Sequence, residues 1–210
     1  MTPPAGLILA GGAGRRLGGA DKPLLRIGGE TILARVLAAL RAAPAKPIAL
    51  SANGDPARFA SFGLSVLGDG SFVGMGPLAG LLAGLDWAHA QGATALLTVP
   101  GDTPFLPPGL AAALAPAPGC AADPDMTNEP RTHHLVALWP VAARTALRDW
   151  LASGTPRAVG AFAARIGMHP VTIPGAPTEA FLNVNTEVDL ARARALADAR
   201  NPRATSRRYT

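Results

Sequence analysis

A loop rich in glycine and arginine follows the first apolar run of the chain. The run Leu7 to Ala10 stops at Gly11-Gly12, and Arg15, Arg16 and Lys22 follow shortly after. Glycines let the main chain approach a ligand closely, and successive N–H groups in such a loop form an anion-binding concavity. With three cations beside it, the loop predicts a polyphosphate site at the end of a buried strand. A flexible surface turn is the alternative.

Two common phosphate loops do not fit this stretch. A Walker loop requires Ser or Thr after its lysine, but Lys22 is followed by Pro23. The dinucleotide fingerprint requires a third glycine where Leu17 stands, and no helical pattern begins there. Lys22 and Lys46 are the only lysines among 19 basic residues. Because an ammonium is not interchangeable with a guanidinium, this scarcity favours Lys22 as a specific phosphate contact.

Carboxylates and amides follow three later apolar runs. Asp102 comes just after the run Thr94 to Val99, and Asn53 and Asp69 follow two shorter runs. Because Mg²⁺ takes one or two carboxylates together with waters and substrate phosphates, Asp102 is a candidate metal ligand. The alternative is that it only caps a turn or the helix near Pro107.

A pair of asparagines precedes the last helical pattern. Asn183 and Asn185 lie two residues apart on an extended run, so both side chains face the same side. Two amides on one face can hydrogen-bond a heterocycle, although one of them could instead cap the helix that Thr186 and Asp189 begin. Arg157 stands just before another predicted helix, where a phosphate could bind or where the arginine could simply be solvated.

The spacing of apolar residues predicts strands alternating with helices. Strands are expected at 5–10, 47–52, 64–67, 94–99, 134–139 and 168–173, and helices at 31–43, 78–90, 141–151, 159–166 and from Thr186. Gly76, Gly80 and Gly84 are poor helix formers and indicate close packing there. The polar stretch Pro116 to Arg131 is expected to be a surface excursion. This alternation favours an α/β fold with a parallel sheet, whose ligands gather at the carboxyl ends of the strands.

Composition narrows the class of protein. The chain has 210 residues, 49% of them hydrophobic, which suits one globular domain. We expect that domain at 1–199, followed by a basic, disordered tail at 200–210. The net charge is +5, but aromatic residues are only 5%, which argues against stacking on nucleic acid. Cys120 is the only cysteine, which excludes an internal disulfide. No stretch suits a bilayer span or signal peptide, so a cytoplasmic location is expected.

Four motifs, in this order, resemble the molybdenum cofactor guanylyltransferases. This family belongs to the nucleotidyltransferases with a glycosyltransferase-A-like fold. The motifs are Leu9-Ala10-Gly11-Gly12 with Arg16-Leu17-Gly18 and Lys22, Gly76-Pro77-Leu78-Ala79-Gly80, Asp102-Thr103-Pro104-Phe105, and Asn183-Val184-Asn185-Thr186. The resemblance runs from about Leu7 to Leu190. It implies a Rossmann-like three-layer αβα sandwich with a mostly parallel sheet, as in nucleotide-diphospho-sugar transferases.

The resemblance also implies an activity and its partners. The family transfers GMP from GTP to the terminal phosphate of molybdenum-loaded molybdopterin and releases pyrophosphate, with Mg²⁺ as cofactor and Mn²⁺ as an alternative. A monomer is expected that binds neither nucleic acid nor membrane. Other cofactor-biosynthesis proteins or acceptor enzymes are candidate partners.

The family resemblance also implies a role for individual residues of each motif. The catalytic residues would be Lys22, Arg16 and Asp102, with Asp102 as the metal ligand. The nucleotide would be bound by Leu9, Ala10, Gly11, Gly12, Lys22, Asn53, Asp69 and Asp102. The pterin would be flanked by Gly76, Gly80, Arg157, Asn183 and Asn185. Arg131, His133 and His134 resemble a segment on the second-substrate side, and their roles stay open.

Other functions remain to be distinguished. The nearest alternative is a cytidylyltransferase for the same cofactor. The corresponding motif of those enzymes reads LAAG, whereas Leu9 to Gly12 of this chain read LAGG. A sugar-phosphate nucleotidyltransferase usually has a longer chain. A non-catalytic nucleotide- or cofactor-binding module and a nucleic-acid binder are the alternatives from other classes.

Overall fold

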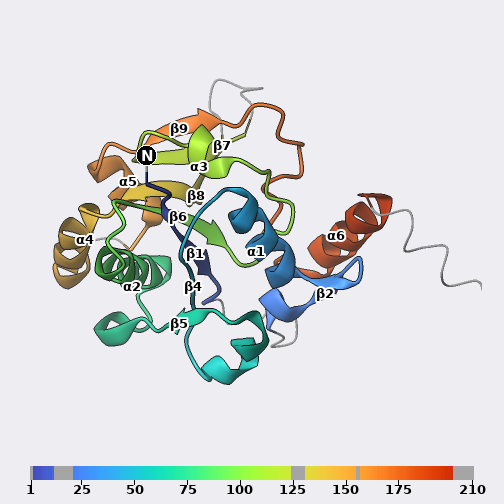
Figure 1. Cartoon of the computed structure of the whole chain (residues 1–210), viewed down its shortest axis with the longest axis horizontal. Coiled ribbons are helices and arrows are strands. Elements are labelled where there is room, and N and C mark those ends of the chain that lie inside the picture. The colour runs from blue at the N-terminus through green and yellow to red at the C-terminus, as the bar shows by residue number, and fades with distance from the viewer. Residues whose placement is uncertain (1, 12–20, 124–130, 155–156, 201–210) are drawn as a thin grey trace, which may run out of the picture.

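A seven-stranded sheet forms the centre of the molecule. The computed structural model describes residues 2–11, 21–123, 131–154 and 157–200. The strand order is β5-β4-β1-β6-β8-β7-β9, and only β8 runs against the others. Figure 1 shows the helices on both sides of this sheet. The expected α/β class and the mostly parallel sheet are confirmed.

The elements begin and end close to the predicted positions. The strands of the large sheet are β1 (Ala5–Leu9), β4 (Ile48–Ser51), β5 (Ser65–Leu67), β6 (Ala95–Pro100), β7 (Gly119–Ala122), β8 (Thr132–Pro140) and β9 (His169–Thr172). The helices are α1 (Ile32–Ala42), α2 (Pro77–Ala90), α3 (Leu110–Ala113), α4 (Ala143–Ala152), α5 (Val159–Arg165) and α6 (Glu187–Arg200). A two-stranded hairpin, β2 (Arg26–Ile27) and β3 (Glu30–Thr31), precedes α1.

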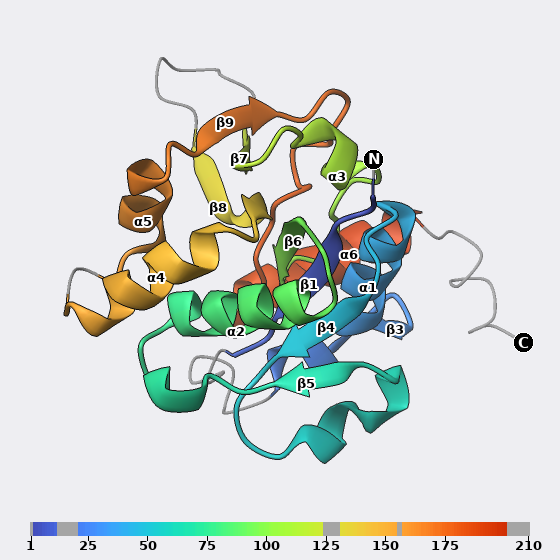
Figure 2. The same ribbon diagram turned by 60° about the vertical axis from the view of Figure 1, so that its left-hand side comes forward.

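Two hydrophobic cores lie on opposite faces of the sheet. Side chains of a strand alternate between faces, so Ile8 of β1 packs with buried residues of α1 and α6, whereas Leu7 packs with those of α2, α4 and α5. Figure 2 shows α2 and α4 in front of the sheet, with α1 and α6 behind it. The three-layer αβα sandwich predicted from the family resemblance is therefore confirmed.

Helix α2 lies unusually close to the sheet. A Cβ atom at Gly84 would overlap Leu7 of β1, and one at Gly80 would overlap Ser51 of β4. Close packing therefore requires Gly80 and Gly84, as expected. Gly76 differs, because a Cβ atom there would meet nothing within 4 Å, and its φ of +74° is what favours glycine. This approach brings the start of α2 against the ends of β1 and β4.

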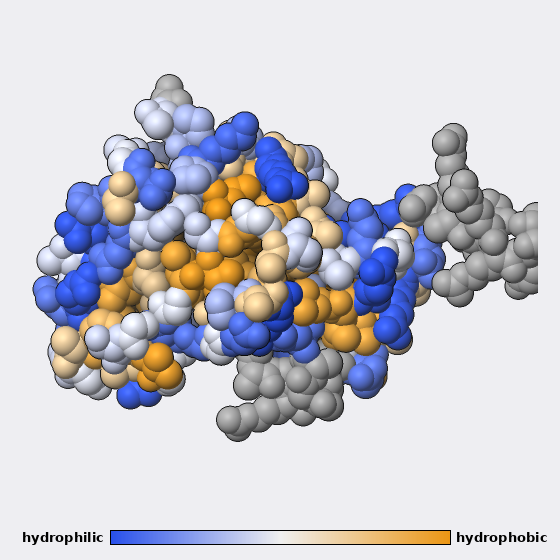
Figure 3. Space-filling view, turned by 60° about the horizontal axis from the view of Figure 1, so that its bottom comes forward, coloured by the Kyte–Doolittle hydropathy of each residue, from blue (hydrophilic) through white to orange (hydrophobic). Residues whose placement is uncertain are grey.

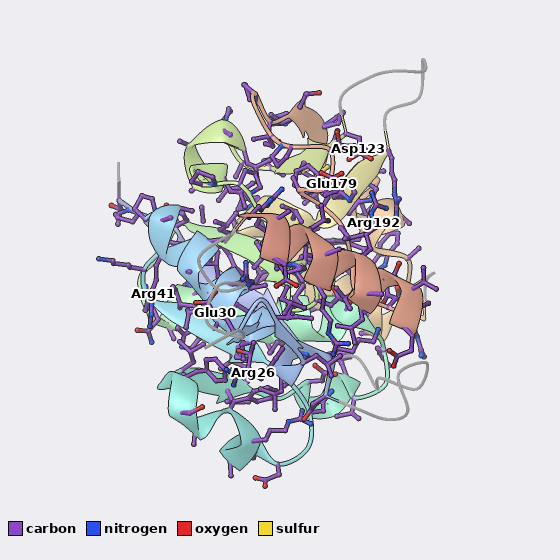
Figure 4. The ribbon with its side chains drawn as sticks, turned by 90° about the vertical axis from the view of Figure 1, so that its right-hand side faces the viewer. Arg26, Glu30, Arg41, Asp123, Glu179 and Arg192 are labelled. Atoms are coloured by element: carbon purple, nitrogen blue, oxygen red, sulfur yellow. The ribbon has the colours of Figure 1, made fainter. Side chains whose placement is uncertain are left out.

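Helix α6 closes the opposite face. Arg192 on α6 forms an ion pair with Glu179 at 3.8 Å, and Figure 4 shows the two side chains beside each other. Gly28, in the turn of the β2–β3 hairpin, approaches Ala197 of α6 so closely that a Cβ atom would overlap it. The β2–β3 hairpin is therefore held against the last helix.

One part of the sequence prediction is wrong. The first residues of Pro116 to Arg131 are not a surface excursion, because β7 is a fully buried strand between β8 and β9. Its sequence, Gly-Cys-Ala-Ala, lacks the branched and aromatic residues typical of strands, and burial comes from its neighbours. The hairpin β2–β3 was also not predicted, whereas α3 lies where a helix near Pro107 was expected.

Two further expectations concern the ends of the chain and membranes. Helix α6 extends to Arg200, and the expected tail beyond it lies outside the described residues. In the part of the chain that the structure describes, no helix combines the length and apolar character needed to cross a membrane.

Candidate functional site

A cavity of about 460 Å³ opens at the carboxyl ends of β1, β4, β5 and β6. It is bordered by five of the residues predicted to bind nucleotide: Leu9, Gly11, Asn53, Asp69 and Asp102. Four of the residues predicted to flank the pterin also line it: Gly76, Gly80, Asn183 and Asn185. The fold thus brings residues from the four motifs to one place. Figure 3 views the molecule from below Figure 1, the side toward which β1 runs, and shows apolar surface bordered by polar side chains.

A small cavity of about 30 Å³ adjoins the large one. Lys22 and Ala10 line it, and Leu9 and Asp102 are shared between the two cavities. Lys22 begins a short 3₁₀ helix, η2 (Lys22–Leu24), which precedes the β2–β3 hairpin. Lys22 and Asp102, which were both predicted to be catalytic, therefore line the same small cavity. Gly12 and Arg16 lie outside the described residues.

Asn53 and Asp69 form a reciprocal pair on one side of the cavity. The Asn53 side-chain Nδ2 donates to Oδ2 of Asp69 at 2.6 Å, and the Asp69 backbone N–H donates to Oδ1 of Asn53 at 3.1 Å. A carboxylate accepts several hydrogen bonds, so Asp69 can accept others as well. Both residues line the cavity, and a carboxylate there suits recognition of a base with hydrogen-bond donors.

Lys22, which lines the small cavity, and Asn185, which lines the main one, are joined by a hydrogen bond between their side chains. Lys22 Nζ donates to Oδ1 of Asn185 at 2.6 Å, although the two residues are 163 positions apart in the sequence. Asn185 is itself held by Asp189, because its backbone N–H donates to Oδ2 of Asp189 at 3.0 Å. The last motif therefore positions the lysine of the first.

Asp189 anchors the start of α6 as the sequence predicted. Thr186 donates to its Oδ2 through both the backbone N–H at 2.8 Å and the hydroxyl at 2.9 Å, and the Asp189 N–H donates back to Thr186 Oγ1 at 3.2 Å. Burial alone would raise the pKa of Asp189. The hydrogen bonds from Thr186 and Asn185 outweigh burial and, with the charge of Arg192, lower that pKa. This capping box fixes where the asparagines sit.

Asp102 lies at the end of β6 and is partly buried. Burial raises the pKa of its carboxyl group, while the charge of Lys22 and hydrogen bonding at Asp102 and Thr103 act in the opposite direction. The Asp102 backbone carbonyl accepts the N–H of Val184 at 2.9 Å. The fully buried Thr103 donates from Oγ1 to Oδ1 of Asn183 at 2.7 Å. These bonds join the Asp-Thr-Pro-Phe motif to the asparagine motif.

A metal ion at this site would depend on its substrates for ligands. Within the described ranges, no three His, Cys, Asp or Glu side chains gather as a metal-binding cluster. The partly buried carboxylate of Asp102 lines the small cavity of about 30 Å³. It fits Mg²⁺, which keeps waters and binds substrate phosphates along with one or two carboxylates. Asp102 is the side chain that fits this role.

A third cavity, of about 260 Å³, adjoins the main one through Pro100, Leu135 and Asn183. Arg131, His133 and His134 line it. His133 Nε2 lies 2.8 Å from Oδ1 of Asp123, and its ring lies 4.5 Å from that of Phe181. Burial, and then the neighbouring His133, lower the pKa of His134. This segment therefore lines a cavity next to the main one, and its place on the second-substrate side stays a prediction.

Arg157 lies at the rim rather than in the main cavity. Its Nη1 donates to the carbonyl of Gly74 at 3.4 Å, and Gly74 lines the cavity. Its role stays a prediction.

The sequence motifs did not single out four residues that lie in or beside the site: Asp21, Ser51, Arg58 and Leu135. Apolar runs marked the strands that carry Ser51 and Leu135, but no pattern marked Arg58.

Comparisons with known proteins agree with this geometry. Residues 6–170 match the model of the MobA-like NTP transferase domain. The chain is 51% identical over 195 residues to a molybdenum cofactor guanylyltransferase from Acidiphilium cryptum (strain JF-5), with 90% of this chain and 96% of the relative covered. A second such enzyme, from Bradyrhizobium sp. (strain ORS 278), is 46% identical over 202 residues, covering 93% and 94%.

This chain belongs to the molybdenum cofactor guanylyltransferase family. As a member of this family it is a nucleotidyltransferase. Solved structures support the fold of this chain. Molybdopterin-guanine dinucleotide biosynthesis protein A from Archaeoglobus fulgidus superposes with a TM-score of 0.69 at 19% identity, covering 93% of this chain and 99% of that one. A nucleotidyl transferase from Methanothermobacter thermautotroptrophicus gives 0.71 at 18% identity, covering 96% and 100%.

Proposed function

We propose that this protein transfers GMP from GTP to the terminal phosphate of molybdenum-loaded molybdopterin. An oxygen of that phosphate attacks the α-phosphorus of GTP, the bond from the α-phosphorus to the bridging oxygen breaks, and pyrophosphate leaves. The products are the guanine dinucleotide form of the cofactor and pyrophosphate. The names of the curated relatives support this reaction.

One observation carries the proposal: Lys22, Asp102 and the pair Asn53–Asp69 border adjoining cavities. Lys22 and Asp102 share the small cavity, while Asn53 and Asp69 line the large one. Lys22 neutralises charge on the triphosphate, and Arg16 would do the same. The backbone from Leu9 to Gly12 would cradle the nucleotide. Positioning and charge neutralisation are the main sources of catalysis in phosphoryl transfer.

Guanine is the base that this pair suits best. The guanine edge presents donors at N1 and the 2-amino group, and a carboxylate is an acceptor. Asn53 occupies Oδ2 of Asp69, so Oδ1 is available in our proposal for that edge. Cytosine lacks this pair of donors, and the cytidylyltransferase alternative would require a different partner here.

Asp102 would hold the divalent cation, Mg²⁺ with Mn²⁺ as the alternative. When bound, such an ion neutralises phosphate charge and orients the α-phosphate for in-line attack. Lys22 lowers the pKa of Asp102 against the effect of burial, which helps to keep that carboxylate ionised. The Thr103 hydroxyl fixes the Asn183 amide behind the site.

The pterin would lie toward α2 and the asparagine motif. Gly76 leaves room beside the cavity, and Gly80 lines it where α2 packs on Ser51. Asn183 and Asn185 supply amides that can hydrogen-bond a heterocycle. Arg157 at the rim would meet a phosphate of the incoming substrate. We further propose a monomer that acts in the cytoplasm, and that other cofactor-biosynthesis proteins or acceptor enzymes exchange the cofactor with it.

Pyrophosphate release tests the proposal. The purified protein is incubated with Mg²⁺, molybdenum-loaded molybdopterin and, in separate reactions, GTP, CTP, ATP or UTP. Strong release with GTP alone is expected, and Lys22→Ala serves as the inactive control. Release with CTP instead would keep the mechanism and overturn the base assignment. A folded protein that releases pyrophosphate with none of the four would contradict the proposal.

A further inference from the structure

Arg58 links two parts of the site that the motifs do not connect. It lies in the first turn of a 3₁₀ helix, η3 (Pro56–Phe62), which follows β4. Asp55 begins this helix by accepting the Ala57 N–H at 2.9 Å, and Pro56 occupies its first position. Because this start is rigid, the Arg58 side chain leaves the backbone at a fixed point beside the cavity.

The guanidinium of Arg58 reaches two acceptors at once. Its Nη1 lies 3.1 Å from each carboxylate oxygen of Asp21, and its Nη2 donates to the backbone carbonyl of Asn53 at 2.7 Å. Asp21 directly precedes Lys22, and Asn53 is the residue that holds Asp69. One side chain therefore contacts both the phosphate side and the base side of the site.

The surroundings hold this guanidinium in place. Its central carbon lies 4.7 Å from the centre of the Phe59 ring, and Phe59 is fully buried. The side chains of Arg58 and Asp21 are 30% and 29% exposed, so solvent screens their ion pair only in part. Within the described residues, the buried Nε of Arg58 has no hydrogen-bond partner. Leaving a buried donor unpaired is unfavourable, and the bonds to Asp21 and Asn53 offset that cost.

We propose that Arg58 is a positioning residue that sets the distance between Lys22 and the base-recognition pair Asn53 and Asp69. Through Asp21 it fixes the segment that carries Lys22. Through the Asn53 carbonyl it fixes the side chains that would read guanine. The inference rests on the proposed function, and it adds a residue to which no motif assigns a role. A planar fork with two donors is required, which an ammonium cannot replace.

Steady-state kinetics of Arg58→Gln test this role. Misplacing a catalytic group by about 1 Å can cost about a hundredfold in rate, so we expect kcat/KM for GTP to fall by about that factor. KM for GTP should rise because Asn53 and Asp69 move, and kcat should fall because Lys22 moves. The preference for GTP over ATP should narrow. A purely structural role would lower Tm and the active fraction but leave KM and the GTP-to-ATP ratio unchanged.

Three further variants make the test specific. Arg58→Lys keeps the charge but not the fork, so its loss should lie between wild type and Arg58→Gln. Asp21→Asn should lower kcat, and combining it with Arg58→Gln should add little, because both changes break one link. Arg148→Gln is the matched control, since it breaks an ion pair to Asp86 of 2.6 Å at residues that do not line the main cavity. It should leave all constants unchanged.

The outcomes separate this inference from the proposed function. Wild-type constants in a folded Arg58→Gln protein, or in Arg58→Lys and Asp21→Asn if Arg58→Gln does not fold, would overturn the inference. An inactive wild type would overturn the proposed function. In that case the affinity of each variant for a fluorescent GTP analogue still tests Arg58. Unchanged affinity in Arg58→Gln and Arg58→Lys would then refute the positioning role.

Discussion

The side chains of Lys22 and Asn185 form a hydrogen bond that connects the first and the last of the four motifs at the site. The lysine ammonium donates to the asparagine amide oxygen at 2.6 Å across 163 positions of sequence. Asn185 is in turn fixed by Asp189 at the start of α6. The position of the proposed phosphate-binding cation thus depends on a helix formed by the last part of the domain.

Lys22→Ala should lower turnover by orders of magnitude. The change removes a full charge from beside the cavity where the triphosphate is proposed to bind, and preorganised charges of this kind are typically worth about a hundredfold or more in kcat. Pyrophosphate release with GTP and Mg²⁺ measures the effect. Lys46→Ala is the matched control, because Lys46 is the other lysine and is exposed before β4. Full activity of a folded Lys22→Ala protein would refute the catalytic role.

Asp102→Asn should abolish most activity without lowering stability. Removing the carboxylate takes away the proposed metal ligand, so the concentration of Mg²⁺ or Mn²⁺ needed for half-maximal turnover should rise steeply. Titration of metal at saturating GTP measures this change. If the metal requirement stays the same, Asp102 does not hold the ion.

The stability of the same variant has a predictable sign. Burial raises the pKa of Asp102 in the folded chain above its unfolded value. The ionised group therefore disfavours folding above the folded pKa, and this effect disappears as the pH falls below the unfolded pKa. In metal-free buffer at neutral pH, the Tm of Asp102→Asn should equal or exceed that of wild type. A clearly lower Tm would show that the carboxylate supports the fold.

The residues at the strand ends were easier to predict from the sequence than the tertiary contacts that hold them together. Apolar runs marked β1, β4 and β6, and the residues that follow them, Gly11, Asn53 and Asp102, do border one cavity. Alternation of buried strands with amphipathic helices was enough for this. By contrast, β7 was missed because Gly-Cys-Ala-Ala has no strand-like side chains, and its burial depends on β8 and β9.

Arg58 could not have been found from the sequence. Its partners are a backbone carbonyl at Asn53 and a carboxylate at Asp21, which is 37 positions away. Neither partner follows a helical or strand period, so only the folded chain reveals the contact. Thr103 is similar, since its bond to Asn183 spans 80 positions. Motif positions were predictable because they sit at strand ends, whereas their supports depend on tertiary packing.

Asp69→Asn should weaken base recognition more than chemistry. The change replaces one acceptor oxygen with a donor amide facing the cavity, which would leave guanine donors unpaired. A site built to bond a polar group typically loses about 1–3 kcal/mol when one partner is left unsatisfied. KM for GTP should therefore rise by about tenfold or more, with a smaller change in kcat.

Inosine triphosphate provides the control for Asp69→Asn. It lacks the 2-amino group, so wild type should prefer GTP over it. The variant should lose most of that preference, because the acceptor that distinguishes the two is gone. A variant that keeps the full wild-type preference would show that Asp69 does not read the 2-amino group.

Asp189→Asn should lower both stability and activity through the capping box of α6. Hydrogen bonds from Thr186 and Asn185 outweigh burial and lower the pKa of Asp189. A carboxylate with a lowered folded pKa stabilises the fold above its unfolded pKa, and this contribution is lost as the pH falls through the folded pKa. Loss of a helix cap typically costs about 1 kcal/mol, so Tm should fall at neutral pH.

The pH dependence distinguishes this cause from a packing defect. The difference in Tm between wild type and Asp189→Asn should be largest at neutral pH and should shrink as the pH falls below the usual Asp range, because wild type then loses the same interaction. The activity of the variant should also fall, since Asn185 and the Lys22 ammonium that it holds would shift. Glu187→Gln is the matched control, because Glu187 is exposed in the same first turn of α6. A Tm difference that stays constant at every pH would show that the ionised carboxylate is not what stabilises the helix start.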